Sequence, residues 1–313
     1  MIPLRIAAAA SAAFFFAFSA SAATLPSNAT GYMLGNNGTT LVTIADLNAP
    51  AIATGVSIAD GTGRAVSMSD IDYRPNTGQI YGYSNADDAV YIIDPATGLA
   101  TLQAASPGAT NVDTLGADFN NVVDAMRMVT TADVNIVFFP NNTPPNIATF
   151  TPPAYATGDV NEGVDPSIFA NAYTNAVPTP STTLQFGLDA TSDALVNIAN
   201  NAGTLTTVGA LFLNGSPFDV GVDGGLDILS FAEGDNTAIA LLTTLAGQGL
   251  YTIPLIADGL GRINAEFVGA VSTQFGLLTG FAVQPNAVPL PASGLALAAG
   301  LATLGLFRRR RRA

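Results

Sequence analysis

Acidic side chains are the main groups in this sequence that could carry chemistry. The chain contains 23 Asp and Glu residues, but no cysteine and no histidine. Their absence excludes disulfides, thiolate metal sites and a cysteine nucleophile, and it removes the commonest general base. Any catalysis would therefore rest on Asp, Glu, Tyr, Ser or Arg side chains.

Asp72 and Asp118, together with Arg74, are the candidate binding residues. Both carboxylates lie in short β-prone runs that we expect to be the innermost strands of a ring of sheets, and Asp70 falls there too. Carboxylates that line a central channel can bind a ligand. A close pair of them can also act as the acid and base of glycoside hydrolysis.

Two observations weaken the catalytic interpretation. The positions equivalent to Asp72 in two other expected innermost strands are Ala172 and Ala282, which interrupts a ring of carboxylates. Aspartates at strand ends and turns also commonly accept backbone N–H groups without any ligand. We therefore predict no catalytic residue and no enzymatic activity. A carbohydrate-binding or glycoside-cleaving protein that uses the channel carboxylates is the alternative.

A second acidic group consists of Asp219, Asp223 and Asp227, around Gly224 and Gly225. Hard oxygen ligands in a glycine-rich turn suit calcium. The three residues do not follow the alternate-residue spacing with which an EF-hand loop wraps the ion. They are therefore candidate metal ligands for calcium, and no other cofactor is expected.

A repeated four-strand unit would position these residues. Residues 70–103 contain four β-prone runs separated by three turns, in which Pro75, Gly78, Pro95 and Gly98 supply the dihedral angles that tight turns require. A four-stranded antiparallel meander of this size is one blade of a β-propeller. One blade alone cannot bury both of its faces.

First strands of five such units can be aligned along the chain, at spacings that fit blades of about 40 to 50 residues with loop insertions. Their third positions are Tyr73, Phe119, Tyr173, Val222 and Val283. The alignment takes residues 220–225 as the first strand of the fourth unit.

Two proline-rich stretches, 141–153 and 177–180, are predicted to be loops because proline cannot occupy a central strand.

The two ends of the repeat region complement each other. The last β-prone run, 277–284, has no strands after it, whereas residues 31–58 supply three strands without a first one. Pairing them would close a circular sheet and remove both open edges. We predict an all-β fold, a five-bladed β-propeller over residues 23–287. A six-bladed ring with a degenerate blade around 141–180 is the alternative.

Several segments resemble a known family. These are DIDYRPNTGQIYGY (70–83), YIIDPATGLATL (91–102) and LDATSDALVNIANNAGTLTTVG (188–209). Their order resembles domain-of-unknown-function family 4394, a β-propeller-like group of exported bacterial proteins. The chain departs from the family pattern at FFPNNTPPN (138–146), where a second Pro-Asp-Thr-Gly-type turn is expected. The family has no assigned activity, so the resemblance implies no functional residue.

Residues 1–22 are predicted to be a secretory signal peptide. Arg5 precedes an apolar run over 6–18, and Ala20-Ser21-Ala22 forms a cleavage site of the A-x-A kind. The apolar run is too short for a membrane-spanning helix, which needs about 20 residues. We therefore expect the protein to be exported across the inner membrane of a Gram-negative bacterium.

Residues 288–313 are similar to PEP-CTERM sorting signals, in the variant spelled V-P-L-P-A. The motif is Val288-Pro289-Leu290-Pro291-Ala292, and an apolar stretch over 294–307 follows it. The chain then carries five consecutive arginines, Arg308, Arg309, Arg310, Arg311 and Arg312. The resemblance implies that an exosortase-type membrane enzyme recognises and cuts this tail.

The tail is predicted to be a short hydrophobic helix that anchors the protein transiently. Its 14 apolar residues would span about 21 Å, less than the roughly 30 Å of a hydrocarbon core. The arginine cluster would hold the C-terminus in the cytoplasm. After cleavage we expect a protein displayed at the cell surface or released into the matrix, where it binds a partner or forms coat material.

The charge of the exported part limits its partners. Residues 23–287 contain four arginines and no lysine against 23 carboxylates, which gives a formal net charge of −19. Such a body repels nucleic acid and anionic lipid. We therefore expect no nucleic-acid partner and name extracellular polysaccharide as the candidate binding partner.

Overall fold

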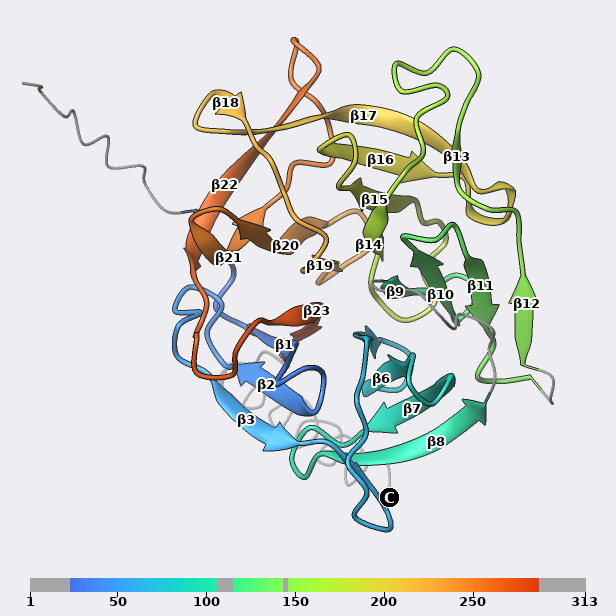
Figure 1. Cartoon of the computed structure of the whole chain (residues 1–313), viewed down its shortest axis with the longest axis vertical. Helices are drawn as coiled ribbons and strands as arrows, with labels where there is room; N and C mark the ends of the chain where they lie inside the picture. Colours follow the sequence, from blue (N-terminus) through green and yellow to red (C-terminus); the bar gives the residue numbers. More distant parts are fainter. Residues whose placement is uncertain (1–22, 106–114, 143–145, 287–313) are drawn as a thin grey trace, which may run out of the picture.

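The computed structural model describes residues 23–105, 115–142 and 146–286, and these residues form sheets arranged in a ring around an axis (Figure 1). Apart from one 3-10 turn at Asn200–Ala202, the described elements are strands. The all-β prediction is confirmed. The predicted signal peptide with Ala20 and Ala22, and the tail with Val288–Ala292 and Arg308–Arg312, lie outside the described residues.

The strands form five antiparallel groups of four, which we number as units 1 to 5 in chain order of their innermost strands. From the axis outward, unit 1 has β5 (Asp70–Arg74), β6 (Gln79–Ser84), β7 (Ala89–Ile93) and β8 (Leu99–Ala105); unit 2 has β9 (Leu115–Asn120), β10 (Ala125–Thr130), β11 (Asn135–Phe138) and β12 (Ile147–Thr149); unit 3 has β14 (Ile168–Tyr173), β15 (Gln185–Asp189), β16 (Ala194–Ile198) and β17 (Thr204–Leu213); unit 4 has β19 (Gly225–Leu229), β20 (Thr237–Thr244), β21 (Gly247–Thr252) and β22 (Arg262–Ala270); unit 5 has β23 (Thr279–Pro285), β1 (Ala29–Gly35), β2 (Thr40–Ile44) and β3 (Thr54–Ser57).

Three short strands pair with the outer edges of these units. Strands β4 (Ala59–Asp60) and β13 (Ala154–Tyr155) pair in parallel with β8 and β17, and β18 (Ser216–Pro217) pairs antiparallel with β17. Strands β17 and β22 also pair in parallel, so the sheets of units 3 and 4 are continuous along the outer rim. These contacts cover outer strands that would otherwise expose unpaired backbone groups.

The two ends of the described chain join in unit 5. Strand β1 pairs antiparallel with β23, with Tyr32 opposite Ala282. The Tyr32 hydroxyl donates to Gln284 Oε1 at 2.9 Å, and the Asn286 N–H donates to the Asn28 carbonyl at 2.7 Å. The predicted pairing of N- and C-terminal strands is confirmed.

Apolar side chains are buried between neighbouring units. Between units 1 and 2, Tyr81 meets Phe119 edge-on at 5.1 Å between ring centroids, and both side chains are at most 2% exposed. A larger cluster, including Phe169 and Leu226, fills the space between units 3 and 4. Each unit therefore buries its faces against its neighbours, as expected for a unit that is unstable alone.

The turns of unit 1 explain why its sequence folds as predicted. Gly78 and Gly98 have positive φ angles of 72° and 75°, the left-handed conformation expected at these positions. A Cβ at Gly98 would also lie 2.0 Å from the Ser57 carbonyl oxygen. This turn therefore requires glycine both for its dihedral angle and for its close approach to unit 5.

One loop prediction needs correction. The stretch 141–153 contains β12, which pairs with β11 as the outermost strand of unit 2. An outer strand tolerates nearby prolines because only one of its edges is paired. No strand is assigned over 177–180, in agreement with the prediction. In the described part of the chain, no helix is long and apolar enough to cross a membrane.

Candidate functional site

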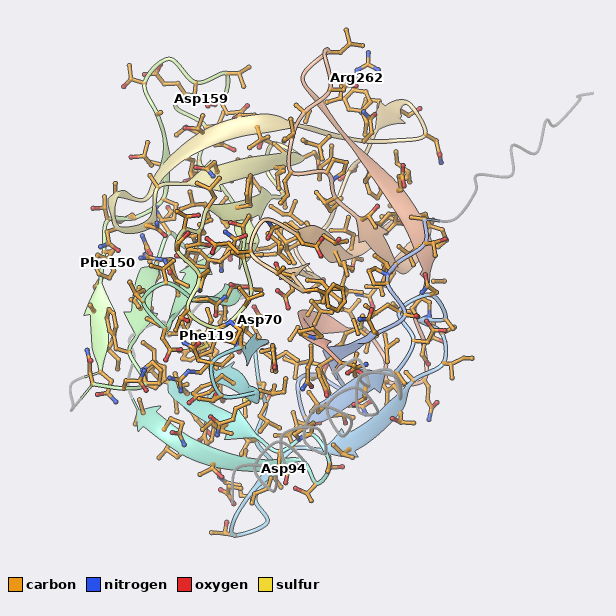
Figure 2. The ribbon with its side chains drawn as sticks, turned by 180° about the vertical axis from the view of Figure 1, so that it is seen from behind. Asp70, Asp94, Phe119, Phe150, Asp159 and Arg262 are labelled. Atoms are coloured by element: carbon orange, nitrogen blue, oxygen red, sulfur yellow. The ribbon has the colours of Figure 1, made fainter. Side chains whose placement is uncertain are left out.

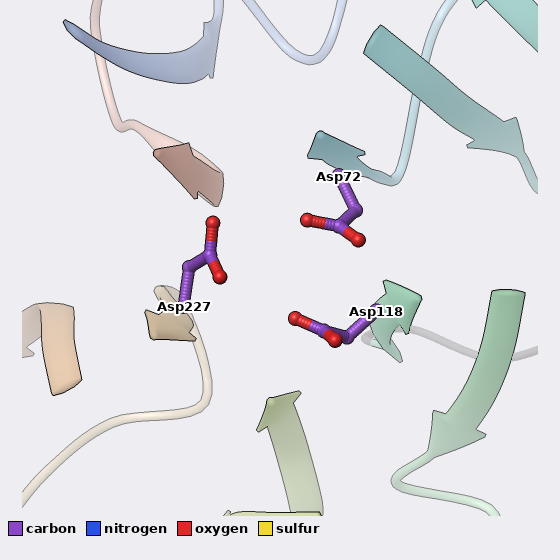
Figure 3. A group of neighbouring side chains, drawn as sticks. All are labelled: Asp72, Asp118 and Asp227. Carbon is purple, nitrogen blue, oxygen red and sulfur yellow. The ribbon is translucent and has the colours of Figure 1, made fainter. Parts of the chain in front are cut away.

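Three carboxylates converge at the axis of the ring. Asp72 on β5, Asp118 on β9 and Asp227 on β19 point toward one another, and one oxygen from each lies within 4.8 Å of the others (Figure 3). All three side chains are buried, with exposed fractions between 2% and 4%. We refer to these three residues as the axial aspartates.

Equivalent positions on the innermost strands explain why these residues meet. Each axial aspartate accepts the N–H of the residue that follows the equivalent position in the next unit: Phe119, Tyr173 or Val283. Ala172 on β14 and Ala282 on β23 occupy the corresponding positions in units 3 and 5, as predicted. The ring of five positions therefore holds three carboxylates and two alanines.

The predicted first strand of unit 4 was wrong, and this concealed the third axial carboxylate. The strand is β19, Gly225–Leu229, rather than residues 220–225. The apolar pattern around Val220 resembles a strand, but that residue belongs to the core between units 3 and 4. The first residue of the true strand must be glycine, because a Cβ at Gly225 would lie 2.5 Å from the Phe281 backbone nitrogen.

The structure also separates the predicted calcium ligands. Asp227 is buried at the axis, Asp223 is partly buried and Asp219 is exposed. Among the described residues, the group of acidic side chains close enough to hold one ion is that of the axial aspartates, not Asp219, Asp223 and Asp227. Asp227 thus belongs to a different site from the one predicted.

Each axial carboxylate connects the backbones of two units. Asp72 accepts the N–H of Tyr73 at 2.6 Å and that of Phe119, in the next unit, at 2.7 Å. Asp118 accepts the Tyr173 N–H at 3.1 Å.

The same pattern recurs at the other carboxylates near the axis. Asp227 accepts N–H groups from Ile228 and from Val283 of unit 5, and Asp70 accepts the Ala117 N–H of unit 2 at 2.6 Å. The innermost strands of these neighbouring units are therefore joined by aspartate side chains. The sequence predicted that these aspartates accept backbone N–H groups. In the structure they do so between neighbouring units rather than within turns.

Burial dominates the electrostatics of the axis. It raises the pKa of Asp70, Asp72 and Asp118 well above the usual range, and the neighbouring carboxylates raise the pKa of Asp72 and Asp118 further. Burial raises the pKa of Asp227 to about 7, while N–H groups of Val283 and Ile228 oppose the shift. The cluster therefore retains protons at neutral pH, because several buried like charges cannot all ionise.

This arrangement limits the chemistry of the axis. Glycoside hydrolysis needs two carboxylates that reach a bound sugar and a water molecule. Here all three are at least 96% buried and are bonded to backbone amides. Calcium prefers six to eight oxygen ligands, and three aspartates that already accept N–H groups fall short of that number. The axis can hold protons readily, but its residues do not complete a calcium site.

Arg74 lies away from the axis, between units 1 and 2. Its Nε donates to Asp124 Oδ1 at 2.8 Å, and its Nη2 bonds the other Asp124 oxygen. The hydroxyl of Tyr81 and Oδ1 of Asn141 accept further N–H groups at 3.0 and 2.9 Å. Arg74 is therefore a neutralised cation within an interface, not a channel residue.

A hollow of about 440 Å³ lies at the mouth of the axis. Its lining includes Tyr73, Pro75, Val177, Phe231 and Pro285, which lie at or just beyond the ends of innermost strands. The surface is mainly apolar and aromatic, so it suits contact with another molecule rather than acid–base chemistry.

A second hollow, of about 250 Å³, lies between units 2 and 3. Arg127, Asn200, Asn201, Phe139 and Phe150 contribute to its lining, and we call it the Arg127 cavity. This cavity was not among the sites predicted from the sequence. Its signal was the single arginine inside AMRMVT (125–130), an otherwise apolar run in which a charge is unexpected.

The fold and the axial aspartates define the class of this protein: a propeller-like all-β protein whose four-strand groups surround an axis. Within that class, the chain belongs to the family described as a domain of unknown function, DUF4394, whose sequence profile matches residues 40–278. The predicted family resemblance is confirmed. The family description names no activity, so no residue takes a role from it.

Several solved structures are similar at low sequence identity. A chain of a nidogen/laminin complex is 11% identical, and the match covers 82% of this chain and 100% of that chain with a TM-score of 0.46. For regucalcin from Agrobacterium tumefaciens, titled a calcium-binding protein, the identity is 13%, the coverage 85% and 78%, and the TM-score 0.43. A virginiamycin B lyase from Staphylococcus aureus is 10% identical with a TM-score of 0.39, covering 83% and 76%. These likenesses carry no inference about activity. A search of curated proteins finds no match.

Proposed function

We propose that this protein is an exported, non-enzymatic five-bladed β-propeller that acts by binding, or as structural coat material, at the cell surface or in the extracellular matrix. Units 1 to 5 would be the five blades. The five four-strand groups and the pairing of β1 with β23 support this count.

The observation that carries the non-enzymatic proposal is the state of the axial aspartates. They are buried and accept N–H groups from neighbouring units, whereas the two hollows are lined mainly by aromatic, apolar and amide side chains. A buried carboxylate that joins two backbones is not available to a substrate. The hollows offer the kind of surface on which a ligand binds.

Conservative variants test the absence of glycoside hydrolysis. Asp72→Asn and Asp118→Asn each retain an oxygen that accepts an N–H group but cannot act as acid or base. We expect no glycosidase activity in the unmodified protein and no change in either variant across a broad panel of chromogenic glycosides. Hydrolysis that disappears in both variants would establish the glycoside-cleaving alternative.

Export and sorting form the second part of the proposal. An exosortase-type enzyme would cut near Pro291 or Ala292, after transient inner-membrane anchoring through residues 294–307. The order of motif, apolar stretch and arginine cluster supports this route. A permanent single-pass anchor is the competing arrangement.

Mass spectrometry of the extracellular protein tests the route. We expect a mature form that lacks residues 294–313, and retention of the protein in the membrane fraction when the processing enzyme is deleted. An extracellular form whose intact mass includes the arginine cluster would contradict the proposed cleavage.

A further inference from the structure

Arg127 is a buried cation surrounded by neutral acceptors. Its side chain lies on β10, and the residue is 4% exposed. Its Nε donates to the Tyr173 hydroxyl at 2.8 Å, and its Nη2 donates to Asn201 Oδ1 at 2.6 Å. Its Nη1 donates to Asn135 Oδ1 and to the Asn200 carbonyl.

This cation forms no ion pair among the described residues. The ion pairs found there belong to Arg64 and Arg74. Asp118, opposite Arg127 on the neighbouring strand β9, accepts the Tyr173 N–H instead, and burial raises the pKa of its carboxyl. Burial raises the pKa of Tyr173 to about 12, so its hydroxyl stays protonated beside Arg127. Arginine cannot lose its own proton under these conditions, and an unpaired buried charge is costly.

The guanidinium has a donor left for a ligand. Its four hydrogen bonds use four of its five N–H groups, which leaves one on Nη2. Phe150 covers the guanidinium at 5.1 Å from ring centroid to Cζ, and it also lines the Arg127 cavity. Asn201, another lining residue, is exposed at the protein surface.

Arg74 shows what is missing at Arg127. Both arginines are buried between units, and both donate to a tyrosine hydroxyl and to an asparagine side chain. At Arg74 the protein itself supplies a carboxylate, that of Asp124. Arg127 has a cavity of about 250 Å³ beside it instead.

We propose that the Arg127 cavity binds the carboxylate of one sugar-acid unit, a hexuronate. The carboxylate would take the remaining Nη2 donor, the side-chain amide of Asn200 would meet a hydroxyl group, and Phe139 and Phe150 would pack against the ring. The volume is below the roughly 300 Å³ at which pockets for drug-sized ligands begin, so a single unit fits better than a chain.

The charge of the whole body sets the expected effect of salt. Residues 23–287 contain four arginines against 23 carboxylates, which repel an anion at long range, and salt screens this repulsion more than it screens a buried contact. Affinity for a hexuronate should therefore stay constant or rise with ionic strength, in contrast to binding at an exposed basic patch.

Calorimetry on the purified full chain, in a mild detergent, tests the proposal. The probes are glucuronate, glucose and acetate at one ionic strength. We expect glucuronate to bind roughly 10- to 100-fold more tightly than glucose, which is the range for hydrogen bonds to a charged group. Acetate should bind more weakly than glucuronate because it lacks the ring and the hydroxyl groups. Equal affinity for glucose and glucuronate, or no binding of glucuronate at millimolar concentrations, would overturn the proposal.

Three variants assign the binding to the cavity. Arg127→Lys keeps the charge but loses the forked donors, and we expect a loss of at least about 10-fold for glucuronate. Arg262→Lys is the matched control, because Arg262 stacks on Phe212 at 4.8 Å and lies far from Phe150 in the ring (Figure 2). Its glucuronate affinity should not change.

Asn201→Ala keeps the test valid if Arg127→Lys fails to fold. Asn201 is exposed, and its removal frees a second Nη2 donor, so glucuronate should bind more tightly, or at least as tightly. An equal loss of glucuronate affinity in Arg127→Lys and Arg262→Lys would mean that glucuronate binds outside the Arg127 cavity. The inference rests on the proposed export only for the source of the ligand, so a failed localisation experiment and a failed titration are separate results.

Discussion

The axis and the Arg127 cavity both place charge-bearing side chains inside the protein, but with opposite signs and opposite consequences. At the axis, three aspartates share a small volume and accept N–H groups from neighbouring units. Between units 2 and 3, one guanidinium donates to neutral oxygens beside a cavity. A buried carboxylate can take up a proton and become neutral, whereas a buried arginine cannot give one up.

This difference separates a structural cluster from a binding site. The axial aspartates remove their own charge by protonation, so their burial calls for no ligand. Arg127 keeps its positive charge, and only a negatively charged group can neutralise it. The number of charged groups is therefore a poor guide to function here, because the larger cluster has a sufficient structural explanation and the single arginine does not.

The largest expected effect comes from making Arg74 resemble Arg127. Asp124→Ala removes the carboxylate partner of a guanidinium whose side chain is 6% exposed. Breaking a buried pair in this way should lower the free energy of unfolding by about 3 kcal/mol. Urea unfolding measures it, with Asp219→Ala at an exposed position as the control. A loss as small as that of the control would mean that Arg74 tolerates an unpaired charge, and the contrast with Arg127 would fail.

Close packing at the axis gives the next effect. A Cβ at Gly116 on β9 would lie 2.4 Å from the Asn171 backbone nitrogen, so Gly116→Ala forces neighbouring units apart. We expect a loss of roughly 2 kcal/mol, within the range for overpacked interiors. Gly259→Ala is the matched control, since a Cβ there meets no atom within 4 Å. Equal thermal stability of the two variants would show that the axis is looser than the structure indicates.

The axial aspartates should make the protein more stable in mild acid. Asp227 has a folded-state pKa of about 7, above the roughly 3.9 of an unfolded aspartate. Its stabilising contribution is complete below the unfolded value and is lost as the pH rises through 7. Lowering the pH from 7.5 to 5 should therefore raise the free energy of unfolding, by about 2 kcal/mol.

Asp227→Asn sharpens this test because an asparagine does not titrate. Its stability should vary less with pH between 5 and 7.5 than that of the unmodified protein. Arg74 lowers the pKa of Asp124, and the contribution of that carboxylate is lost only in stronger acid. A protein that becomes less stable from pH 7.5 to 5 would contradict protonation at the axis.

The smallest effect is expected at the rim of the Arg127 cavity. Asn201→Ala removes one neutral acceptor at an exposed residue, so the loss in unfolding free energy should stay below about 1 kcal/mol. Differential scanning calorimetry measures this loss, with Arg262→Lys as the control variant. A loss comparable to that of Asp124→Ala would mean that the asparagine, not a ligand, is the main partner of Arg127.

Sequence patterns were sufficient for much of the fold because local rules governed it. The turns with Gly78 and Gly98 and the unpaired runs at 31–58 and 277–284 led to the four-strand unit and to the pairing of β1 with β23. The prediction of the first strand of unit 4 was wrong because the residues around Val220 follow a strand-like apolar pattern. The true strand begins at Gly225, where the close approach of Phe281 leaves no room for a side chain, and this contact joins segments far apart in the chain.

The candidate site was only partly predictable for the same reason. Asp72 and Asp118 could be placed on innermost strands, but their connection to the N–H groups of Phe119 and Tyr173 depends on how units pack. Arg127 has no distinctive local motif. Its importance comes from the absence of an ion-pair partner among the described residues, which no single sequence displays.

Thermal unfolding of the full chain with two added ligands tests the contrast between the two regions most directly. At pH 7 and constant ionic strength, we expect glucuronate to raise the melting temperature, because a ligand that binds the folded state stabilises it. The increase should disappear in Arg127→Lys, and millimolar calcium should cause no increase. Stabilisation by calcium that is lost in Asp227→Asn, without any effect of glucuronate, would show that the axis, and not the Arg127 cavity, holds the ligand.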